Sequence, residues 1–197
     1  MNKQLLKDNY LVVREFISPE EAARCAREFR ELDSQEYFPG DDQAPNSSAA
    51  YNVMPALEIH CNTAHKVSEA AQTFVLPTYC YSRIYKTGCD LKKHMDRGAC
   101  EVSVTLHLEG DTDWPISIES SDGTPHSVVL KPGDAMIYLG CVAPHWRTKY
   151  RGKEYVQFFM HYVRSRGACS DVYFDREDKV NNIERIEMLT QEYNAIR

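Results

Sequence analysis

From Thr78 onward the chain divides into short segments rich in β-branched and aromatic residues, separated by glycine, proline and aspartate. Segments of this kind are typical of strands joined by tight turns, because glycine, proline and aspartate accept the backbone conformations that turns require. We therefore predict two packed antiparallel sheets. The expected strands cover residues 79–85, 91–97, 101–108, 115–119, 126–130, 134–139 and 153–163.

The segment before Thr78 is mainly helical. Ser18 and Glu21 form a capping box with Pro19 at the first helical position, and apolar residues then recur at helical spacing. A second helix is expected from about residue 55 to 75, ending before Pro77. Together these elements predict an α+β fold, a double-sheet jelly roll backed by N-terminal helices. The expected apolar faces are Ala22, Cys25, Ala26, Phe29 and Leu32 in the first helix, and Leu57, Cys61, Ala64, Val67, Ala71 and Phe74 in the second.

Two further segments are irregular. Residues 37–48 lack any apolar period and are predicted to form a long loop, either a lid over a binding site or a plain connection. The segment that starts at Ser170 and includes Glu177 and Asp178 is predicted to be a polar connection to a terminal helix, and we expect no chemistry from it.

Size and charge agree with a small soluble enzyme. A chain of 197 residues buries roughly 70% of its unfolded surface, so one domain over 1–197 is expected. A formal net charge of −6 argues against nucleic acid or an anionic membrane as the main partner. The chain has no apolar run of about eighteen residues and no signal-peptide pattern, which favours the cytoplasm. Seven cysteines without paired spacing fit reduced thiols better than disulfides or a zinc site.

Three residues form a candidate metal site. His94 and Asp96 are one residue apart, and in an extended strand such residues point to the same face. His145 follows well downstream and would complete a set of two imidazoles and one carboxylate. Such a set on one face of Fe(II) leaves positions open for other ligands, as in non-heme iron oxygenases. The alternative is that these are ordinary surface residues.

The residues around these three carry a family resemblance. The order is a Tyr-x-x-Gly turn at residues 85–88, then His94 and Asp96, then a Pro-Gly-Asp turn at 132–134, then His145. This resembles the 2-oxoglutarate and Fe(II)-dependent dioxygenases, most closely their prolyl-4-hydroxylase-like branch. The resemblance covers most of the chain, from about residue 11 to residue 163.

The resemblance implies a fold and an activity. The fold is a distorted double-stranded β-helix, and the cofactors are Fe(II), 2-oxoglutarate as cosubstrate and O2, with ascorbate as a possible addition. The implied reaction releases succinate and CO2 and hydroxylates an unactivated C–H bond. His94, Asp96 and His145 are then the metal ligands and the catalytic centre.

The cosubstrate anchor departs from the family pattern. Relatives carry a basic residue about nine positions after the distal histidine, where this chain has Glu154 next to Lys153. Arg83 shares a strand face with Tyr85, which in the family lies near the cosubstrate, and a buried guanidinium needs an anion. We therefore rank Arg83 first as the partner of the distal carboxylate, Lys153 second and Arg147 third. An internal ion pair of Arg83 is the competing interpretation.

Other residues receive weaker assignments. His107 falls where some prolyl hydroxylases place a tyrosine that touches the cosubstrate, and it shares its strand face with Ser103 and Thr105. Arg97 and Trp114 are expected near the barrel mouth. No chemical role is expected for the remaining histidines, which are His60, His65, His126 and His161.

Alternative functions remain open at this stage. A double-stranded β-helix can also be a cupin-type, non-catalytic module that binds a small ligand or a metal. Among enzymes, the substrate can be a small molecule or a peptide, and the acidic Asp41 and Asp42 would suit a basic peptide. Halogenation is disfavoured, because the carboxylate ligand Asp96 is present.

Overall fold

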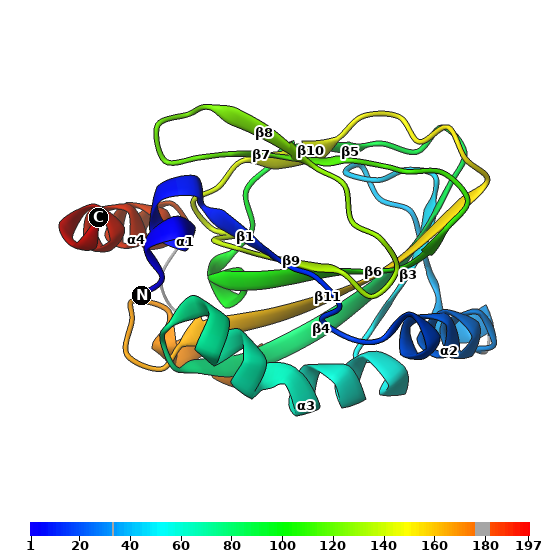
Figure 1. Cartoon of the computed structure of the whole chain (residues 1–197), viewed down its shortest axis with the longest axis horizontal. Coiled ribbons are helices and arrows are strands. Elements are labelled where there is room, and N and C mark those ends of the chain that lie inside the picture. Colours follow the sequence, from blue (N-terminus) through cyan, green and yellow to red (C-terminus); the bar gives the residue numbers. More distant parts are fainter. Residues whose placement is uncertain (33, 176–181) are drawn as a thin grey trace.

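The computed structural model describes residues 1–32, 34–175 and 182–197. Strands form two antiparallel layers that face each other (Figure 1). The larger layer contains β1 (Tyr10–Val13), β2 (Phe38–Pro39), β3 (Ser47–Tyr51), β4 (Val75–Lys86), β6 (Val102–Gly110), β9 (Ala135–Tyr138) and β11 (Glu154–Arg164). The smaller layer contains β5 (Leu91–His94), β7 (Ile116–Glu119), β8 (Pro125–Val128) and β10 (His145–Arg147).

The strand order is that of a jelly roll. It is β1-β9-β6-β11-β4-β3-β2 in the larger sheet and β5-β10-β7-β8 in the smaller one. Strands far apart in sequence are therefore neighbours, and all their pairings are antiparallel. The predicted α+β double-sheet fold is confirmed.

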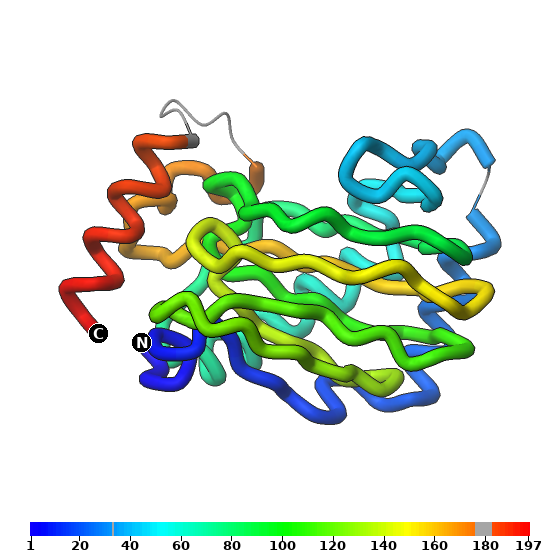
Figure 2. Tube along the Cα trace, turned by 90° about the horizontal axis from the view of Figure 1, so that it is seen from above, coloured from blue at the N-terminus to red at the C-terminus, as the bar shows by residue number. Residues whose placement is uncertain are grey.

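Helices lie under the larger sheet and at one end of the molecule (Figure 1). They are α1 (Lys3–Asp8), α2 (Pro19–Arg30), α3 (Met54–Ala71) and α4 (Asn182–Ile196), with 3-10 turns η1 (Ser34–Glu36), η2 (Gly98–Cys100) and η3 (Ser170–Asp175). α2 and α3 lie under the larger sheet, whereas α1 and α4 lie at one end, where both termini are found (Figures 1 and 2). The predicted cap of α2 is present, because the Ser18 hydroxyl accepts the Glu21 N–H at 3.1 Å.

Alternation along β6 separates two interiors. Val102, Val104, Leu106 and Leu108 belong to the main apolar core with buried residues of α2 and α3, as the strand period predicts. The intervening Ser103, Thr105 and His107 are buried on the opposite face, which is turned towards the smaller sheet. The space between the sheets is therefore polar and aromatic along β6 and has an apolar cluster of β7, β8 and β9 residues beside it, whereas the space under the larger sheet is mainly apolar.

Several sequence expectations need correction. Residues 37–48 are not one loop, because β2 and β3 lie at its ends and extend the larger sheet. The helix over 55–75 ends at Ala71 with a left-handed Gln72, so Phe74 lies outside it and is exposed. Its buried face includes His60 rather than Cys61. The helix α1 and the three-residue strand β10 were not predicted, because both are too short to show a period.

The remaining expectations concern termini and thiols. The predicted terminal helix is α4, and the polar connection before it, with Glu177 and Asp178, falls partly on residues outside the described ranges. All seven cysteines are free, as predicted. Within the described ranges, none of the helices combines the length and the apolar composition that a bilayer crossing requires.

Candidate active site

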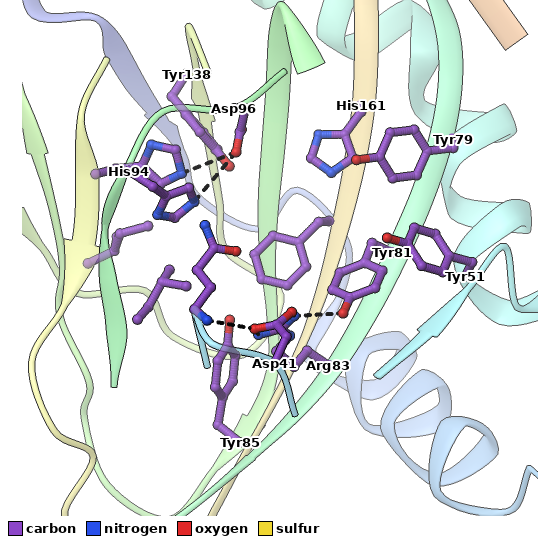
Figure 3. Close-up of a pocket in the computed structure, with 15 residues that line it drawn as sticks. Asp41, Tyr51, Tyr79, Tyr81, Arg83, Tyr85, His94, Asp96, Tyr138 and His161 are labelled. Atoms are coloured by element: carbon purple, nitrogen blue, oxygen red, sulfur yellow. Dashed lines mark hydrogen bonds and ion pairs between the residues drawn. The ribbon is translucent and has the colours of Figure 1, made fainter. Parts of the chain in front are cut away.

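A pocket of about 150 Å³ lies between the two sheets. Its walls come from β3, β4, β9 and β11 of the larger sheet, from β5, β7 and β10 of the smaller one, and from the loop at residues 40–46 (Figure 3). His94 and Asp96 lie on one side of this space, opposite His161, Tyr79 and Tyr81 (Figure 3). The pocket therefore has one side rich in metal-ligating groups and one side rich in aromatic rings.

Cross-strand register brings the two histidines together. β10 pairs with β5 so that His145 lies directly opposite His94, and their ring centroids are 4.2 Å apart. Directly opposite residues in an antiparallel pair present their side chains on the same face. Asp96 completes the group, and ligand atoms of all three residues lie within 4.8 Å of one another.

The rings are oriented by backbone carbonyls. The Nδ1 atom of His94 lies 2.7 Å from the Lys92 carbonyl oxygen, and that of His145 lies 2.9 Å from the Ala143 carbonyl oxygen. If both Nδ1 atoms donate, both Nε2 atoms keep a lone pair. These Nε2 atoms lie 3.5 and 3.7 Å from the same Asp96 oxygen, Oδ1. Hydrogen bonds from Nδ1 to backbone carbonyls hold imidazole rings in the orientation that a metal ligand needs.

The shifted pKa values of His145 and Asp96 also suit a metal. Burial lowers the pKa of His145 despite the opposing charge of Asp96. Burial by itself would raise the pKa of Asp96, but the two facing histidines hold it below its ordinary value. Neutral imidazoles and an ionised carboxylate are the ligand forms that Fe(II) takes. The residues present therefore fit an Fe(II) ion.

Asp96 reaches its place from a loop rather than from a strand. β5 ends at His94, so the expectation that residues 94 and 96 share one extended strand is wrong. The Asp96 N–H donates to the Gly140 carbonyl at 2.9 Å instead, and Ser103 Oγ donates to Asp96 Oδ2 at 3.3 Å. A Cβ on Gly140 would lie 2.4 Å from Asp96 Oδ2, so only glycine allows this approach.

Sequence reasoning missed His161. It lines the pocket, its Nδ1 lies 2.9 Å from Ser103 Oγ, and its ring packs on Tyr79 at 4.6 Å. Burial lowers its pKa to about 4, so it is neutral near pH 7. His161, Asp96 and Cys100 also bring ligand atoms within 4.8 Å of one another. Strand alternation could have found His161, because Phe159, two residues earlier, lines the same pocket.

The predicted face of β4 does line the pocket. Tyr81, Arg83 and Tyr85 all contribute to its wall, with Tyr79 beside them. The Arg83 guanidinium lies 5.0 and 5.7 Å from the ring centres of Tyr81 and Tyr85. Arg83 is also paired with Asp41 of the 40–46 loop, so the internal ion pair considered from sequence exists.

The other predicted cosubstrate residues lie away from the pocket wall. Lys153 is exposed, and its backbone N–H donates to the Asp111 carboxylate in a turn. His107 is buried and stacks on Tyr155 at 4.1 Å, and burial lowers its pKa to about 3. Neither residue lines the pocket. Glu154 is bound by Arg30 and Lys86 on the other face of β11.

Trp114 and Arg147, which the sequence suggested as further pocket residues, are both buried in contacts within the protein. Trp114 is buried against Tyr85 and Tyr155, and its indole N–H donates to the Thr148 carbonyl. It therefore lies inside the barrel rather than at its mouth. Arg147 is buried beside it, donating to the Trp114 carbonyl and to Gln157 Oε1.

Solved structures show what this chain is similar to. No family model matches the sequence, and no curated protein is similar to it at sequence level. A Pseudomonas putida prolyl-4-hydroxylase is 17% identical with a TM-score of 0.66, over 82% of this chain and 95% of that one. An oxidoreductase of the 2OG-Fe(II) oxygenase family from Burkholderia pseudomallei is 13% identical with a TM-score of 0.68, over 82% and 88%.

A third structure holds ligands. HygX from Streptomyces hygroscopicus, with nickel and 2-oxoglutarate bound, is 11% identical with a TM-score of 0.65, over 85% of this chain and 89% of that one. The fold of this chain is therefore the double-stranded β-helix of 2-oxoglutarate-dependent Fe(II) oxygenases, as the resemblance of its motifs implied.

Proposed function

We propose that this protein is a 2-oxoglutarate-dependent non-heme Fe(II) dioxygenase that hydroxylates an unactivated C–H bond, over one domain of residues 1–197. One observation carries the proposal. His94 Nε2, His145 Nε2 and an Asp96 oxygen converge on the wall of a pocket in a fold that oxygenases share. A facial set of two histidines and one carboxylate leaves adjacent positions on the metal open.

Each group has a defined part. His94, Asp96 and His145 hold Fe(II), which when bound couples the oxidative decarboxylation of 2-oxoglutarate by O2 to oxidation of the substrate; ascorbate is a possible reductant for the iron. The backbone carbonyls of Lys92 and Ala143 keep both imidazoles in the ligating orientation. The pocket walls orient the reacting groups, and the protein supplies position rather than acid or base.

Arg83 is the first candidate for the distal carboxylate of 2-oxoglutarate. It is a buried cation on the pocket wall, and Tyr85 beside it is buried with its hydroxyl directed into the pocket (Figure 3). Arginine binds carboxylates through paired N–H groups. Lys153 and His107 lack such a position and are weaker candidates.

The substrate is a small molecule or a peptidyl group that lies against the aromatic side of the pocket. Tyr51, Tyr81 and Phe159 follow one another along this side, with ring centroids 4.6 and 6.1 Å apart. Tyr51 is exposed and packs on the exposed Phe38, so the aromatic surface continues outward. Aromatic rings supply apolar contact area with little loss of side-chain entropy.

The cellular setting follows from composition. Free cysteines favour a reducing compartment, so we place the protein in the cytoplasm. The net charge of −6 argues against nucleic acid as a partner, and no membrane partner is proposed.

The decisive test measures succinate. Purified protein with Fe(II), O2 and 2-oxoglutarate should form succinate even without substrate, through uncoupled turnover. Asp96→Ala should lose iron retention and succinate formation together, whereas Asp42→Ala, which removes an exposed aspartate, should keep both. A cupin-type binding module would bind metal without consuming 2-oxoglutarate. Wild-type turnover in Asp96→Ala would remove the ligand assignment.

A further inference from the structure

The Arg83–Asp41 pair joins the pocket wall to the loop that borders it. Arg83 Nη2 lies 2.7 Å from Asp41 Oδ2, and Nη1 lies 3.5 Å from Oδ1. The two partners differ in burial, since the Arg83 side chain is 5% exposed and the Asp41 side chain is 51% exposed. Figure 3 shows Asp41 beside this guanidinium, at the end of the pocket that Tyr85 also lines. The Asp41 carboxylate is therefore bound to the same guanidinium that we assign to the distal carboxylate of the cosubstrate.

The two oxygens of Asp41 do different things. Oδ1 accepts the backbone N–H groups of Gln43 and Ala44 at 3.0 and 2.8 Å, which holds the turn of the loop. Oδ2 contacts Arg83. Loss of the Arg83 contact therefore leaves the local turn intact, and the half-exposed carboxylate regains water in exchange.

The loop is fastened independently of this pair. The Gln43 carbonyl accepts the Lys92 N–H at 3.2 Å, and the Asn46 carbonyl accepts the Lys86 N–H at 3.0 Å. Ala44 is fully buried against Tyr85 and its neighbours. Release of Asp41 from Arg83 is therefore a side-chain movement, with no need for the loop to unfold.

Asp41 only partly satisfies the guanidinium. Nη2 is engaged by Asp41 and by the Tyr81 hydroxyl at 2.6 Å, but the buried Nε has no hydrogen-bond partner among the described residues. A planar carboxylate that met Arg83 side-on would make two parallel bonds, the stronger arrangement. The site thus has unused capacity for a better-placed carboxylate.

We propose that Asp41 is an internal competitor for Arg83, and that this competition determines affinity and selectivity for the cosubstrate. The proposal rests on the proposed function. The incoming distal carboxylate takes the place of Asp41, so the charge around Arg83 is the same before and after binding. Keto acids without a second carboxylate cannot make the exchange, so Asp41 affects dicarboxylic keto acids alone.

The test uses an isosteric change. Asp41→Asn keeps an oxygen for the Gln43 and Ala44 N–H groups and removes the charge beside Arg83. Asp42→Asn is the matched control, because it removes the same charge from the neighbouring exposed residue. 2-Oxoglutarate and pyruvate are titrated by calorimetry into the Mn(II)-loaded protein without O2. Pyruvate has the keto acid group but no distal carboxylate.

Asp41→Asn should bind 2-oxoglutarate about three- to tenfold more tightly than the wild type, the gain from removing a half-exposed competing ion pair. Pyruvate affinity should be unchanged, and Asp42→Asn should leave both affinities unchanged. In an Arg83→Gln background, 2-oxoglutarate should bind more weakly and Asp41→Asn should have no effect. The guanidinium for which the two carboxylates compete is then absent. If Asp41→Asn does not fold, Asp41→Ser keeps the turn acceptor without the charge.

Equal or weaker binding of 2-oxoglutarate by Asp41→Asn would overturn the proposal, as would equal tightening for pyruvate. Either result leaves the proposed function in place, provided that the wild type binds 2-oxoglutarate in a Mn(II)-dependent manner. If the wild type shows no such binding, the proposed function and this inference both fail.

Discussion

Two arginine–carboxylate pairs stand in contrasting regions of the larger sheet. Arg83–Asp41 lies at the pocket between the sheets, whereas Arg164–Glu101 lies where β11 meets η2 and α4. Glu101 is fully buried and also accepts the Arg164 N–H at 2.9 Å and the Tyr193 hydroxyl at 3.0 Å. Asp41 is half exposed.

The different burial of the two carboxylates indicates what each ion pair does. A fully buried carboxylate with three donors has no alternative partner, so its pair is part of the folded structure. A half-exposed carboxylate can return to water at little cost, so its pair can be exchanged for a ligand. Burial of the anion, rather than the presence of arginine, separates a structural pair from an exchangeable one.

The largest expected effect comes from breaking the structural pair. Glu101→Gln takes the buried carboxylate away from Arg164 and leaves it paired with the partly exposed Glu192, which should lower the free energy of unfolding by about 3–5 kcal/mol. Glu192→Gln is the control, because Glu192 contacts the same Arg164 at 2.8 Å but is 35% exposed, and it should cost less than about 1 kcal/mol. Chemical denaturation measures both. Equal losses of unfolding free energy in the two variants would show that burial of the carboxylate does not decide what the ion pair contributes.

An intermediate effect is expected at the metal end of the pocket. Gly140→Ala places a Cβ against Asp96 Oδ2 and against the Cys100 carbonyl oxygen. The displaced carboxylate should weaken Mn(II) binding roughly 10- to 100-fold, the range typical when groups that orient metal ligands are lost. Metal titration followed by electron paramagnetic resonance measures the affinity.

Gly123→Ala separates this effect from general destabilisation. Gly123 has a φ of 83° in an exposed turn with no atom near its Cβ position, so alanine costs roughly 1 kcal/mol of stability through strain alone. Its Mn(II) affinity should equal that of the wild type. Unchanged affinity in Gly140→Ala would mean that Asp96 does not need its present position to hold a metal.

The smallest effect is the pH dependence of the exchangeable pair. Burial by itself would raise the pKa of Asp41, but the Arg83 bond and the Gln43 and Ala44 N–H groups lower it. A lowered folded pKa means stability that is present above the unfolded value of about 3.9 and lost as the pH falls through the folded value. Because Asp41 is half exposed, this amounts to less than about 1 kcal/mol.

Unfolding of the wild type and Asp41→Asn should therefore differ by a small, constant amount from pH 7 to about pH 5, and the difference should shrink below about pH 4. Urea titrations at these pH values measure it. A difference that grows towards low pH would contradict the sign of the pKa shift.

Local sequence patterns predicted the strand faces and the metal-binding motif. Period-two alternation placed Tyr81, Arg83 and Tyr85 on one face, and they line one pocket. The motif around His94 and Asp96 indicated a metal site, and the structure brings both residues to His145. In each case the information lies within one strand or one motif, which local sequence can carry.

Long-range pairings were not predictable in this way. Asp41 meets Arg83 from a loop 42 positions away in sequence, and no local period records that partner. Sequence reasoning assigned no role to His161, although a ring nitrogen of His161 and an oxygen of Asp96 lie within 4.8 Å of each other. The rank given to Lys153 came from spacing after His145, but Lys153 lies in the exposed turn before β11 and faces away from the pocket.

Alternation, turn chemistry and motif order are local properties of the chain, so the amino-acid sequence was enough to predict the fold class and the residues able to bind a metal. Tertiary structure alone decided which arginine lines the pocket and which carboxylate it meets. It also decided that Asp96 reaches the histidines from a loop beside Gly140. The physical reason is that antiparallel pairing and loop closure join residues that are distant in sequence, and the burial of each group depends on those contacts.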